Sequence, residues 1–453
     1  MSIAAKFNDQ QLRTLVVGLG ATGLSVARYL MAQGVQVAVV DSREQPPGLE
    51  QLQAEYADMA VFLGAFDDAV FEQADMLVVS PGVPQSTPQI AAAKARGVPV
   101  VGDVELFARA ARAPVVAITG SNGKSTVTTL VGEMAKAAGR KVAVGGNLGT
   151  PALDLLDEEI ELYVLELSSF QLETTYSLSA AVACVLNVQA DHMDRYPDIE
   201  TYADAKAVIM HGAGLGVYNA DDQRVMAMRG SDDTWLFTLG EPSGDKVFGV
   251  RAIGDQHWLC RGEQVLMAVD DLRIPGRHNQ ANALAALAIG SALGFSADDM
   301  SQVLQTFPGL AHRTEYVAEV NGVRWYNDSK ATNVGAALAA LLGMHTGDES
   351  RSVIILGGDC KDGEFEEMTG PLAQCARGVV LFGRDIEDIR PVIPQGMPVA
   401  EAKDMDEVVA LAAEMALPGD RVLLSPACAS FDRFRNFAER GDVFRNTVRR
   451  FAA

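Results

Sequence analysis

A glycine-rich loop that contains a lysine carries the most specific chemistry in this sequence. Residues 119–126 read Thr-Gly-Ser-Asn-Gly-Lys-Ser-Thr, between an apolar run typical of a buried strand and a stretch that predicts a helix from Lys124. The amides of such a loop bind phosphate oxygens, the lysine reaches the β and γ phosphates, and the hydroxyl of Ser125 can bind Mg²⁺. Ile118 occupies the first glycine position of the general pattern. The loop predicts nucleotide binding rather than a chance helix cap, and ATP rather than GTP, since no Asn-Lys-x-Asp motif occurs.

A second glycine turn lies near the N-terminus. Residues 18–23 read Gly-Leu-Gly-Ala-Thr-Gly between a predicted strand and a predicted helix, and Asp41 ends the next predicted strand. This is the dinucleotide fingerprint, in which glycines let the backbone approach a diphosphate and the carboxylate binds a sugar hydroxyl. Taken alone, the motif indicates NAD, although it recognises a diphosphate and not hydride chemistry. A tight strand-to-helix turn without a ligand is the alternative.

Candidate metal ligands follow two predicted strands of the second block. Glu166 ends one strand, and residues 191–194, Asp-His-Met-Asp, follow the next. Ligands of open α/β sheets bind at the carboxyl ends of the strands, so Glu166 and His192 are expected to meet beside the phosphate loop. Carboxylate oxygens suit magnesium and imidazole can fill one position. Lys206 falls on the following predicted helix and, taken alone, is expected to be exposed to solvent.

Charged residues recur after the second block. Residues 311–313 read Ala-His-Arg, and residues 328–333 read Asp-Ser-Lys-Ala-Thr-Asn after a predicted strand. An arginine, an aspartate and a lysine beyond a phosphate-loop domain could be delivered across a cleft onto a nucleotide. A salt-bridged seam between domains explains the same spacing, and both interpretations stay open at this point.

The elements that must position these residues alternate between strands and helices almost throughout. At 453 residues the chain exceeds a single hydrophobic core, which stops growing near about 250–300 residues. The pattern predicts an α/β protein of three domains: a Rossmann-like domain over 1–102, a central phosphate-loop ATPase-like domain with a mainly parallel sheet over 103–308, and a Rossmann-like α/β domain over 309–453. Within the second domain, residues 235–272 alternate apolar and polar side chains and predict a β-rich insertion.

Composition excludes several classes of protein. Hydrophobic residues make up 48% and the formal net charge is −22, so a folded protein is expected and a nucleic-acid-binding surface is not. The five cysteines are scattered, which favours free thiols in a reducing compartment. No secretory signal or membrane-spanning run is found, so we expect a cytoplasmic protein without membrane insertion.

Taken together, the motifs resemble the Mur ligases of peptidoglycan synthesis, in that family's order and over nearly the whole chain. The segments that carry the resemblance are residues 120–126, 191–194, 276–279 (Gly-Arg-His-Asn), 311–313, 328–333 and 425–430 (Ser-Pro-Ala-Cys-Ala-Ser). Within the family, the chain is most similar to the members that add D-glutamate to UDP-N-acetylmuramoyl-L-alanine. The resemblance implies an ADP-forming amide ligase that uses ATP and Mg²⁺, with two ions, proceeds through an acyl phosphate, and acts as a monomer on small molecules in the cytoplasm.

The resemblance also implies roles for residues of this chain. Catalytic roles fall to Lys124, His192 and a carbamylated Lys206. The residues expected around ATP are Gly120, Ser121, Asn122, Gly123, Lys124, Ser125, Thr126, Asn279, Arg313, Asp328 and Lys330. The expected metal ligands are Ser125, Glu166, His192 and Lys206. The UDP substrate is expected at Leu19, Gly20, Ala21, Asp41, Ser42, Gly82, Asn147 and His192, so the first glycine turn would hold UDP and not NAD. D-glutamate is expected at Thr332, Lys361, Ser430 and Phe437.

Other functions remain as alternatives. A different Mur-type or folylpolyglutamate-type ligase would share the ATP site and accept another amino acid, although the folate enzymes are expected to lack the 18–41 segment. A dinucleotide-dependent dehydrogenase and a regulatory phosphate-loop binding module are less favoured, because neither needs all of these motifs together.

Overall fold

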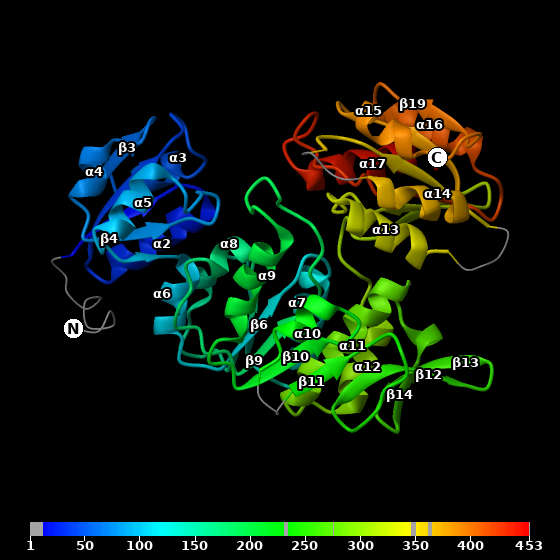
Figure 1. Ribbon diagram of the computed structural model, residues 1–453, viewed down its shortest axis with the longest axis horizontal. Helices are drawn as coiled ribbons and strands as arrows, with labels where there is room; N and C mark the ends of the chain where they lie inside the picture. The colour runs from blue at the N-terminus through cyan, green and yellow to red at the C-terminus, as the bar shows by residue number, and fades with distance from the viewer. Residues whose placement is uncertain (1–11, 231–233, 275, 346–349, 361–364, 453) are drawn as a thin grey trace.

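The computed structural model describes residues 12–230, 234–274, 276–345, 350–360 and 365–452. These residues form three α/β domains, each built on its own sheet, as the sequence predicts. Figure 1 shows the N-terminal domain in blue, the central domain in cyan to green and the C-terminal domain in yellow to red.

The N-terminal domain is a parallel sheet of five strands in the order β3-β2-β1-β4-β5. Its elements are β1 (Arg13–Val17), α2 (Ala21–Ala32), β2 (Gln36–Asp41), α3 (Leu49–Glu55), β3 (Ala60–Leu63), α4 (Asp68–Glu72), β4 (Met76–Val79), α5 (Pro88–Ala95) and β5 (Val100–Val101). Val16 and its neighbour Val39 face one apolar cluster, whereas Val17 and Val40 face another. Both faces of the sheet are therefore covered, which explains why its strands are continuous apolar runs.

The central domain holds a sheet of nine strands in the order β14-β13-β12-β11-β10-β9-β6-β8-β7. Its strands are β6 (Val115–Thr119), β7 (Val142–Gly146), β8 (Leu162–Glu166), β9 (Val182–Val185), β10 (Leu215–Asn219), β11 (Thr234–Phe237), β12 (Val247–Ile253), β13 (Gln256–Arg261) and β14 (Gln264–Ala268). Strands β7 to β12 pair in parallel, and β12, β13 and β14 pair antiparallel. The β-rich segment predicted over 235–272 thus extends the ATPase-like sheet, first through the parallel strand β11 and then through the antiparallel strands β12, β13 and β14.

Helices cover both faces of this sheet. They are α6 (Asp103–Ala110), α7 (Lys124–Ala137), α8 (Ser169–Leu172), α9 (Ile199–Ala207), α10 (Gln223–Ala227), α11 (Arg277–Ala292) and α12 (Ala297–Thr306), with 3₁₀ turns at Ala152–Leu155, Val208–Met210 and Val269–Asp271. The Ala-rich helix α11 packs against α7 and brings its N-terminus next to the phosphate loop. Helix α11 begins at Arg277, directly after Gly276.

The C-terminal domain is a six-stranded sheet in the order β15-β16-β20-β17-β18-β19, parallel except for the β15–β16 hairpin. Its strands are β15 (Glu315–Val320), β16 (Val323–Asn327), β17 (Ser352–Leu356), β18 (Ala376–Leu381), β19 (Val399–Glu401) and β20 (Arg421–Leu424). Its helices are α13 (Val334–Gly343), α14 (Thr369–Cys375), α15 (Ile386–Ile389), α16 (Met405–Met415) and α17 (Phe437–Ala452), with 3₁₀ turns at Glu366–Met368 and Arg390–Val392.

The start of helix α6 is attached to the central domain. Glu105 is fully buried and its carboxylate accepts from the amides of Tyr176 and Ser177 at 2.7 and 2.8 Å. The Gly102 amide donates to the Thr174 carbonyl at 3.1 Å, and a Cβ at position 102 would lie only 2.3 Å from the Thr174 hydroxyl. The chain therefore enters the central fold directly at this glycine. In the described ranges, no helix is both long and apolar enough to cross a membrane.

Gly23 sets the closest approach of helix α2 to strand β1. A Cβ at this position would lie 1.9 Å from the Gly18 carbonyl oxygen. We expect Gly23→Ala to lower the free energy of unfolding of the N-terminal domain by about 1–3 kcal/mol, because the backbone must move apart. Gly82→Ala is the matched control, since its Cβ meets nothing within 4 Å. Thermal denaturation of both variants checks this, and equal midpoints would contradict it.

Candidate functional site

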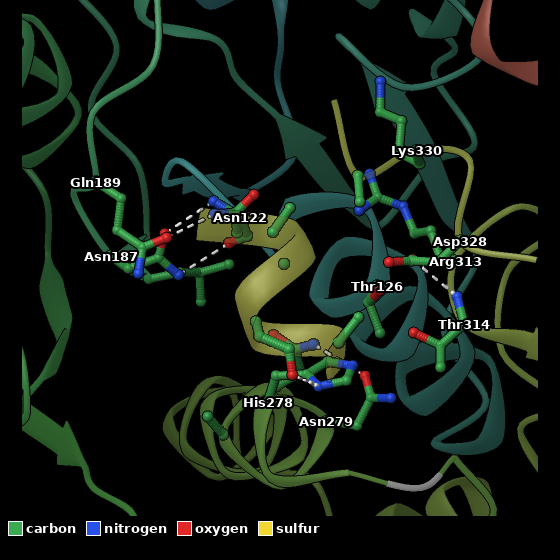
Figure 2. A pocket seen from close by; sticks show the side chains of 18 of the residues that line it. Asn122, Thr126, Asn187, Gln189, His278, Asn279, Arg313, Thr314, Asp328 and Lys330 are labelled. Atoms are coloured by element: carbon green, nitrogen blue, oxygen red, sulfur yellow. Dashed lines mark hydrogen bonds between the residues drawn. The ribbon is translucent and has the colours of Figure 1, made fainter. Parts of the chain in front are cut away.

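A cavity of about 240 Å³ lies between the central and C-terminal domains. Figure 2 shows that side chains from both domains line it. The central domain contributes the phosphate loop and the first turn of α11, including Asn122, Thr126 and Asn279. The C-terminal domain contributes Arg313, Thr314, Asp328 and Lys330. Two groups of residues predicted to bind ATP, far apart in the sequence, thus share one cavity.

The phosphate loop has the backbone that its glycines predict. Gly123 is at φ +85° immediately before helix α7, and a Cβ there would lie 2.4 Å from the Asn282 amide oxygen. The Lys124 ammonium donates to the carbonyls of Gly120 and Ser121 at 2.7 and 2.9 Å. Burial lowers the pKa of Lys124, against the opposing effect of nearby carboxylates. The amides without intrahelical partners and the positive end of the helix dipole at the start of α7 make this loop an anion-binding site.

Residues that the sequence analysis did not single out hold the loop in place. The Asn122 amide donates to the side chain of Asn187 at 2.8 Å, and Asn187 donates back to the Asn122 carbonyl at 3.0 Å. The Asn122 side chain also donates to Gln189 at 2.8 Å (Figure 2), and Ser121 donates to the Gln189 carbonyl at 2.9 Å. Asn187 and Gln189 follow strand β9, which is the signal that could have identified them.

Arg313 crosses from the C-terminal domain to the phosphate loop. Its guanidinium donates to the Ser125 hydroxyl at 2.7 Å, so the structure brings it onto the nucleotide-binding loop. Asp328 lies beside it and accepts from Ser425 at 2.8 Å and from the Thr314 amide at 3.0 Å. Burial raises the pKa of Asp328 to about 6. Arg313 makes this contact with a hydroxyl and not with a carboxylate, which favours delivery across a cleft over a salt-bridged seam.

Lys330 is a second cation delivered by the C-terminal domain. Its ammonium lies 4.0 Å from the centre of the Phe437 ring. Burial, helped by the positive charges of Arg313 and Lys124, lowers the pKa of Lys330 to about 8. Because burial and neighbouring cations destabilise the charged form of Lys330, a polyanionic ligand would stabilise that form.

Glu166 is a buried carboxylate that retains one oxygen for a ligand. One oxygen accepts from the Asn147 side chain at 2.7 Å, whereas Oε2 is buried and has no hydrogen-bond partner in the part of the chain that the structure describes. Lys124 and Arg313 are close enough for their pKa values to respond to its charge. A buried carboxylate oxygen is costly unless it is paired, so this position suits a cation.

His192 projects from the loop after β9 in a left-handed conformation, at φ +59°. Its Nε2 lies 3.7 Å from the Asp191 carboxylate and its ring packs 4.8 Å from Phe170. Asp191 in turn accepts from Asn333 of the C-terminal domain at 3.1 Å. This is a second contact between the two domains. Within the described ranges, no cluster of three or more His, Cys, Asp or Glu side chains could hold a metal alone.

Lys206 is buried, so the expectation of a solvent-exposed side chain was wrong. Only 1% of the residue is exposed, because α9 packs against the phosphate-loop side of the sheet. Its ammonium donates to the Gly120 carbonyl at 3.0 Å and lies 4.3 Å from the centre of the Tyr202 ring. Burial, helped by the charge of Lys124, lowers its pKa well below the usual value.

Asp41 binds backbone amides of its own domain and so helps to hold the N-terminal glycine turn. The buried carboxylate accepts from the Leu19 amide at 2.7 Å and from the Arg43 amide at 2.9 Å, and the Arg43 guanidinium pairs with it. Ala21 begins helix α2, whose first amides lack intrahelical partners. Ser42 and Gly82 are exposed on loops of the same domain.

Arg195 joins the N-terminal and central domains and was missed by the sequence analysis. Its guanidinium donates to the carbonyls of Pro81 and Val83 at 3.1 and 3.2 Å, on either side of Gly82, and lies 4.3 Å from the centre of the Phe170 ring. Its amide donates to the His192 carbonyl at 2.9 Å. The carbonyls of Pro81 and Val83 that bind its guanidinium lie more than a hundred residues away in sequence, so no local pattern indicates them.

The residues expected at D-glutamate lie in the C-terminal domain. The Phe437 carbonyl accepts from Ser329 at 2.7 Å, Thr332 is partly buried and Ser430 is buried. Lys361 lies outside the described residues. Arg440, which the sequence analysis did not identify, is 2% exposed and donates to the Cys428 carbonyl at 3.1 Å, so it shapes this loop.

Three domain families match consecutive parts of the chain. The N-terminal domain of MurD-like Mur ligases matches residues 12–102, the Mur ligase middle domain matches 118–290, and the glutamate ligase domain of Mur ligases matches 312–428. The UDP-N-acetylmuramoylalanine–D-glutamate ligase of Nitrosococcus oceani is 53% identical over 438 residues, 96% of each chain. The enzyme of that name from Pseudomonas putida is 51% identical over 446 residues, 98% of each chain.

Solved structures show the same fold at low sequence identity. MurF from Acinetobacter baumannii aligns with a TM-score of 0.60 at 16% identity, covering 96% of this chain and 93% of that chain. MurC from Thermotoga maritima aligns with a TM-score of 0.59 at 19% identity, covering 97% and 99%. The three-domain arrangement is therefore common to chains with very different sequences.

The lowered pKa of Lys330 predicts a pH dependence for nucleotide binding. The ammonium is charged below about pH 8 and loses its proton above it, so ATP affinity of the free protein should fall as pH rises through 8. Lys330→Arg should bind ATP more weakly overall but without this decline, because a guanidinium stays charged. Calorimetric titration between pH 6.5 and 9.5 measures the ATP affinity of both proteins. The affinity of the wild type should fall on the order of tenfold over this range. Parallel pH profiles for the two proteins would assign the decline to another group.

Proposed function

This chain belongs to the Mur ligase family, and we propose that it is an ATP-dependent ligase that joins D-glutamate to UDP-N-acetylmuramoyl-L-alanine in peptidoglycan precursor synthesis. The observation that carries the proposal is the contact of Arg313 with Ser125, because it completes a phosphate-binding cavity from two domains. The relatives at 50–53% identity supply the identity of the acceptor and of the amino acid.

The chemistry requires activation of a carboxylate. The carboxylate of the muramoyl-L-alanine attacks the γ phosphorus of ATP, ADP leaves, and a mixed anhydride forms. The amine of D-glutamate then attacks the acyl carbon, and the tetrahedral intermediate expels phosphate to give the amide. Phosphate is a far better leaving group than oxide, and holding both reactants in contact can supply about 7–11 kcal/mol of the barrier.

The cations of the cavity have a direct role in this scheme. Lys124 and the amides of 120–126 hold the β and γ phosphates, while Arg313 and Lys330 approach from the other domain and stabilise charge on the transferring group. Asn279, at the first turn of α11, and Asp328 are assigned to the base and ribose. Arg313 and Lys330 can reach the phosphates only when the two domains are together.

The residues present fit magnesium. Glu166 Oε2 is buried without a protein partner, the Ser125 hydroxyl lies beside the phosphate loop, and His192 is assigned to a second ion. When bound, Mg²⁺ would neutralise charge on the ATP phosphates. Because protein carboxylates are few here, phosphate oxygens and water would supply the remaining ligands.

Lys206 fits the assigned carbamate. An amine attacks carbon dioxide only in its neutral form, and burial beside Lys124 favours that form. The product is a carboxylate, which converts a buried amine into an anion next to the Lys124 ammonium. This explains why a lysine occupies a site 1% exposed.

The N-terminal turn is assigned to UDP. Gly20 and Ala21 at the start of α2, with Leu19 and Ser42, form the proposed uridine diphosphate site, and Asp41 shapes it through its contact with the Leu19 amide. Gly82, Asn147 and His192 extend the site toward the phosphate loop, with Arg195 joining the loops of Gly82 and His192. D-glutamate is assigned to Thr332, Lys361, Ser430 and Phe437.

The proposal also covers domain bounds, location and oligomeric state. The proposed domains are 1–102, 103–308 and 309–453, and the proposed protein is a cytoplasmic monomer. A ligase for another amino acid, a dehydrogenase and a regulatory binding module remain the alternatives that the next experiment separates.

The deciding experiment is a matrix of acceptors and amino acids with ADP release as the readout. We expect ADP only when UDP-N-acetylmuramoyl-L-alanine and D-glutamate are both present, and a fall of at least about a thousandfold in Lys124→Ala, since the phosphates lose their cation. Turnover with another amino acid would replace the proposed specificity. ADP release without an acceptor, or full activity of Lys124→Ala, would contradict the ligase assignment.

Arg195 allows a sharper test of the N-terminal site. Arg195→Ala should raise the KM for the UDP acceptor about tenfold or more while the KM for ATP changes little, because the loop around Gly82 loses its anchor and the phosphate loop keeps its own contacts. Arg112→Ala is the matched control, since Arg112 pairs with Glu158 on the surface. Steady-state kinetics with each substrate varied separately measures this. Equal increases for ATP and acceptor would indicate a general structural defect instead.

A further inference from the structure

Two cysteines of the C-terminal domain lie in contact although they are 68 residues apart. The sulfur atoms of Cys360 and Cys428 are separated by 2.8 Å. Both residues are buried, at 7% and 1% exposure. Both are free thiols in the structure.

The backbone explains why these side chains face one another. Strands β17 and β20 are parallel neighbours, and the segments that follow them meet at an antiparallel bridge. At that bridge Asp359 and Ala429 exchange both backbone hydrogen bonds, each at 2.9 Å. Cys360 and Cys428 occupy the next pair along, which is a non-hydrogen-bonded pair. Cα atoms of such a pair are typically about 4.5 Å apart, inside the range that disulfides span.

We propose that Cys360 and Cys428 form a reversible disulfide when the protein encounters a peroxide. The sulfurs need to approach by less than about 1 Å to reach bonding distance. The other cysteines are placed in separate elements, Cys184 in β9, Cys260 in β13 and Cys375 at the end of α14.

The reaction balances with hydrogen peroxide as the oxidant. Cys360 is the more exposed thiol, so its thiolate attacks one peroxide oxygen, the O–O bond breaks, and hydroxide leaves to form water. The resulting sulfenic acid is attacked by the sulfur of Cys428, and a second water departs as the S–S bond forms. Two thiols and one peroxide thus give one disulfide and two waters. The hydrogen bond with the Cys360 sulfur and burial raise the pKa of Cys428, so the second step is expected to be slow.

The crosslink would constrain a loop that matters for the proposed reaction. Cys428 lies two residues before Ser430, which is assigned to D-glutamate, and Arg440 binds the Cys428 carbonyl at 3.1 Å. Ala427 already holds a left-handed backbone at φ +60°. Because the loop cannot relax freely, closing the sulfur contact should change the KM for D-glutamate by about threefold or more and leave the KM for ATP unchanged. This second part rests on the proposed function, whereas the disulfide itself does not.

The test uses the full-length protein treated with hydrogen peroxide and then with an alkylating reagent. Peptide mapping by mass spectrometry should find a linked Cys360–Cys428 peptide pair that is lost after reduction with dithiothreitol. Cys360→Ser should abolish this product, and Cys375→Ser is the matched control because Cys375 is also a buried thiol of the same domain. Wild-type mapping stands alone if a variant fails to fold.

Each outcome decides the matter. Sulfinic or unmodified Cys360 and Cys428 in peroxide-treated wild type, or linkage of either to another cysteine, would overturn the disulfide. A linked pair with an unchanged KM for D-glutamate would overturn its coupling to the reaction. Absence of ligase turnover in the reduced protein would count against the proposed function while the mapping result keeps its meaning.

Discussion

The concentration of positive charge around one cavity is the constraint on which the rest of this structure depends. Lys124, Arg313 and Lys330 converge on the phosphate loop, and Lys206 lies buried behind it, in a chain whose net charge is −22. Burial disfavours each of these charges, and their mutual repulsion adds to that cost. A polyphosphate offsets both effects at once, so the cavity is built to favour that ligand over neutral molecules of similar size.

The positive charge is also divided between domains. Lys124 and Lys206 lie on helices α7 and α9 of the central domain, whereas Arg313 and Lys330 come from the C-terminal domain. Polar contacts from Arg313 to Ser125, from Asn333 to Asp191 and between the His278 ring and the Ala339 carbonyl join the two domains. Such polar contacts can break and form again without exposing a core. A bound polyphosphate would therefore contribute much of the interaction that holds the central and C-terminal domains together.

Local patterns in the sequence were enough to predict the strands next to the motifs, the phosphate loop and the three-domain α/β architecture. The reason is that glycines at tight turns and apolar runs in buried strands act over a few residues. Lys206 was misjudged from spacing alone, because only the packing of α9 against the phosphate loop reveals its burial. Arg195 was missed for a similar reason, since the carbonyls it binds belong to another domain. Asp41 shows a third limit: a fingerprint places the carboxylate correctly but cannot say that a neighbouring amide and Arg43 already engage it.

The direct entry of the chain into the central fold at Gly102 has a consequence for how such proteins diversify. Because α6 is anchored through Glu105 to Tyr176 and Ser177, this helix keeps these contacts if the preceding domain is removed, whereas Arg195 and Asp154 lose their N-terminal partners. Gene fusion could therefore exchange the first domain for one that recognises a different carrier, with the apolar face beneath α2 and these few polar contacts left to be refitted. The N-terminal domain can therefore evolve independently of the two domains that form the phosphate-binding cavity.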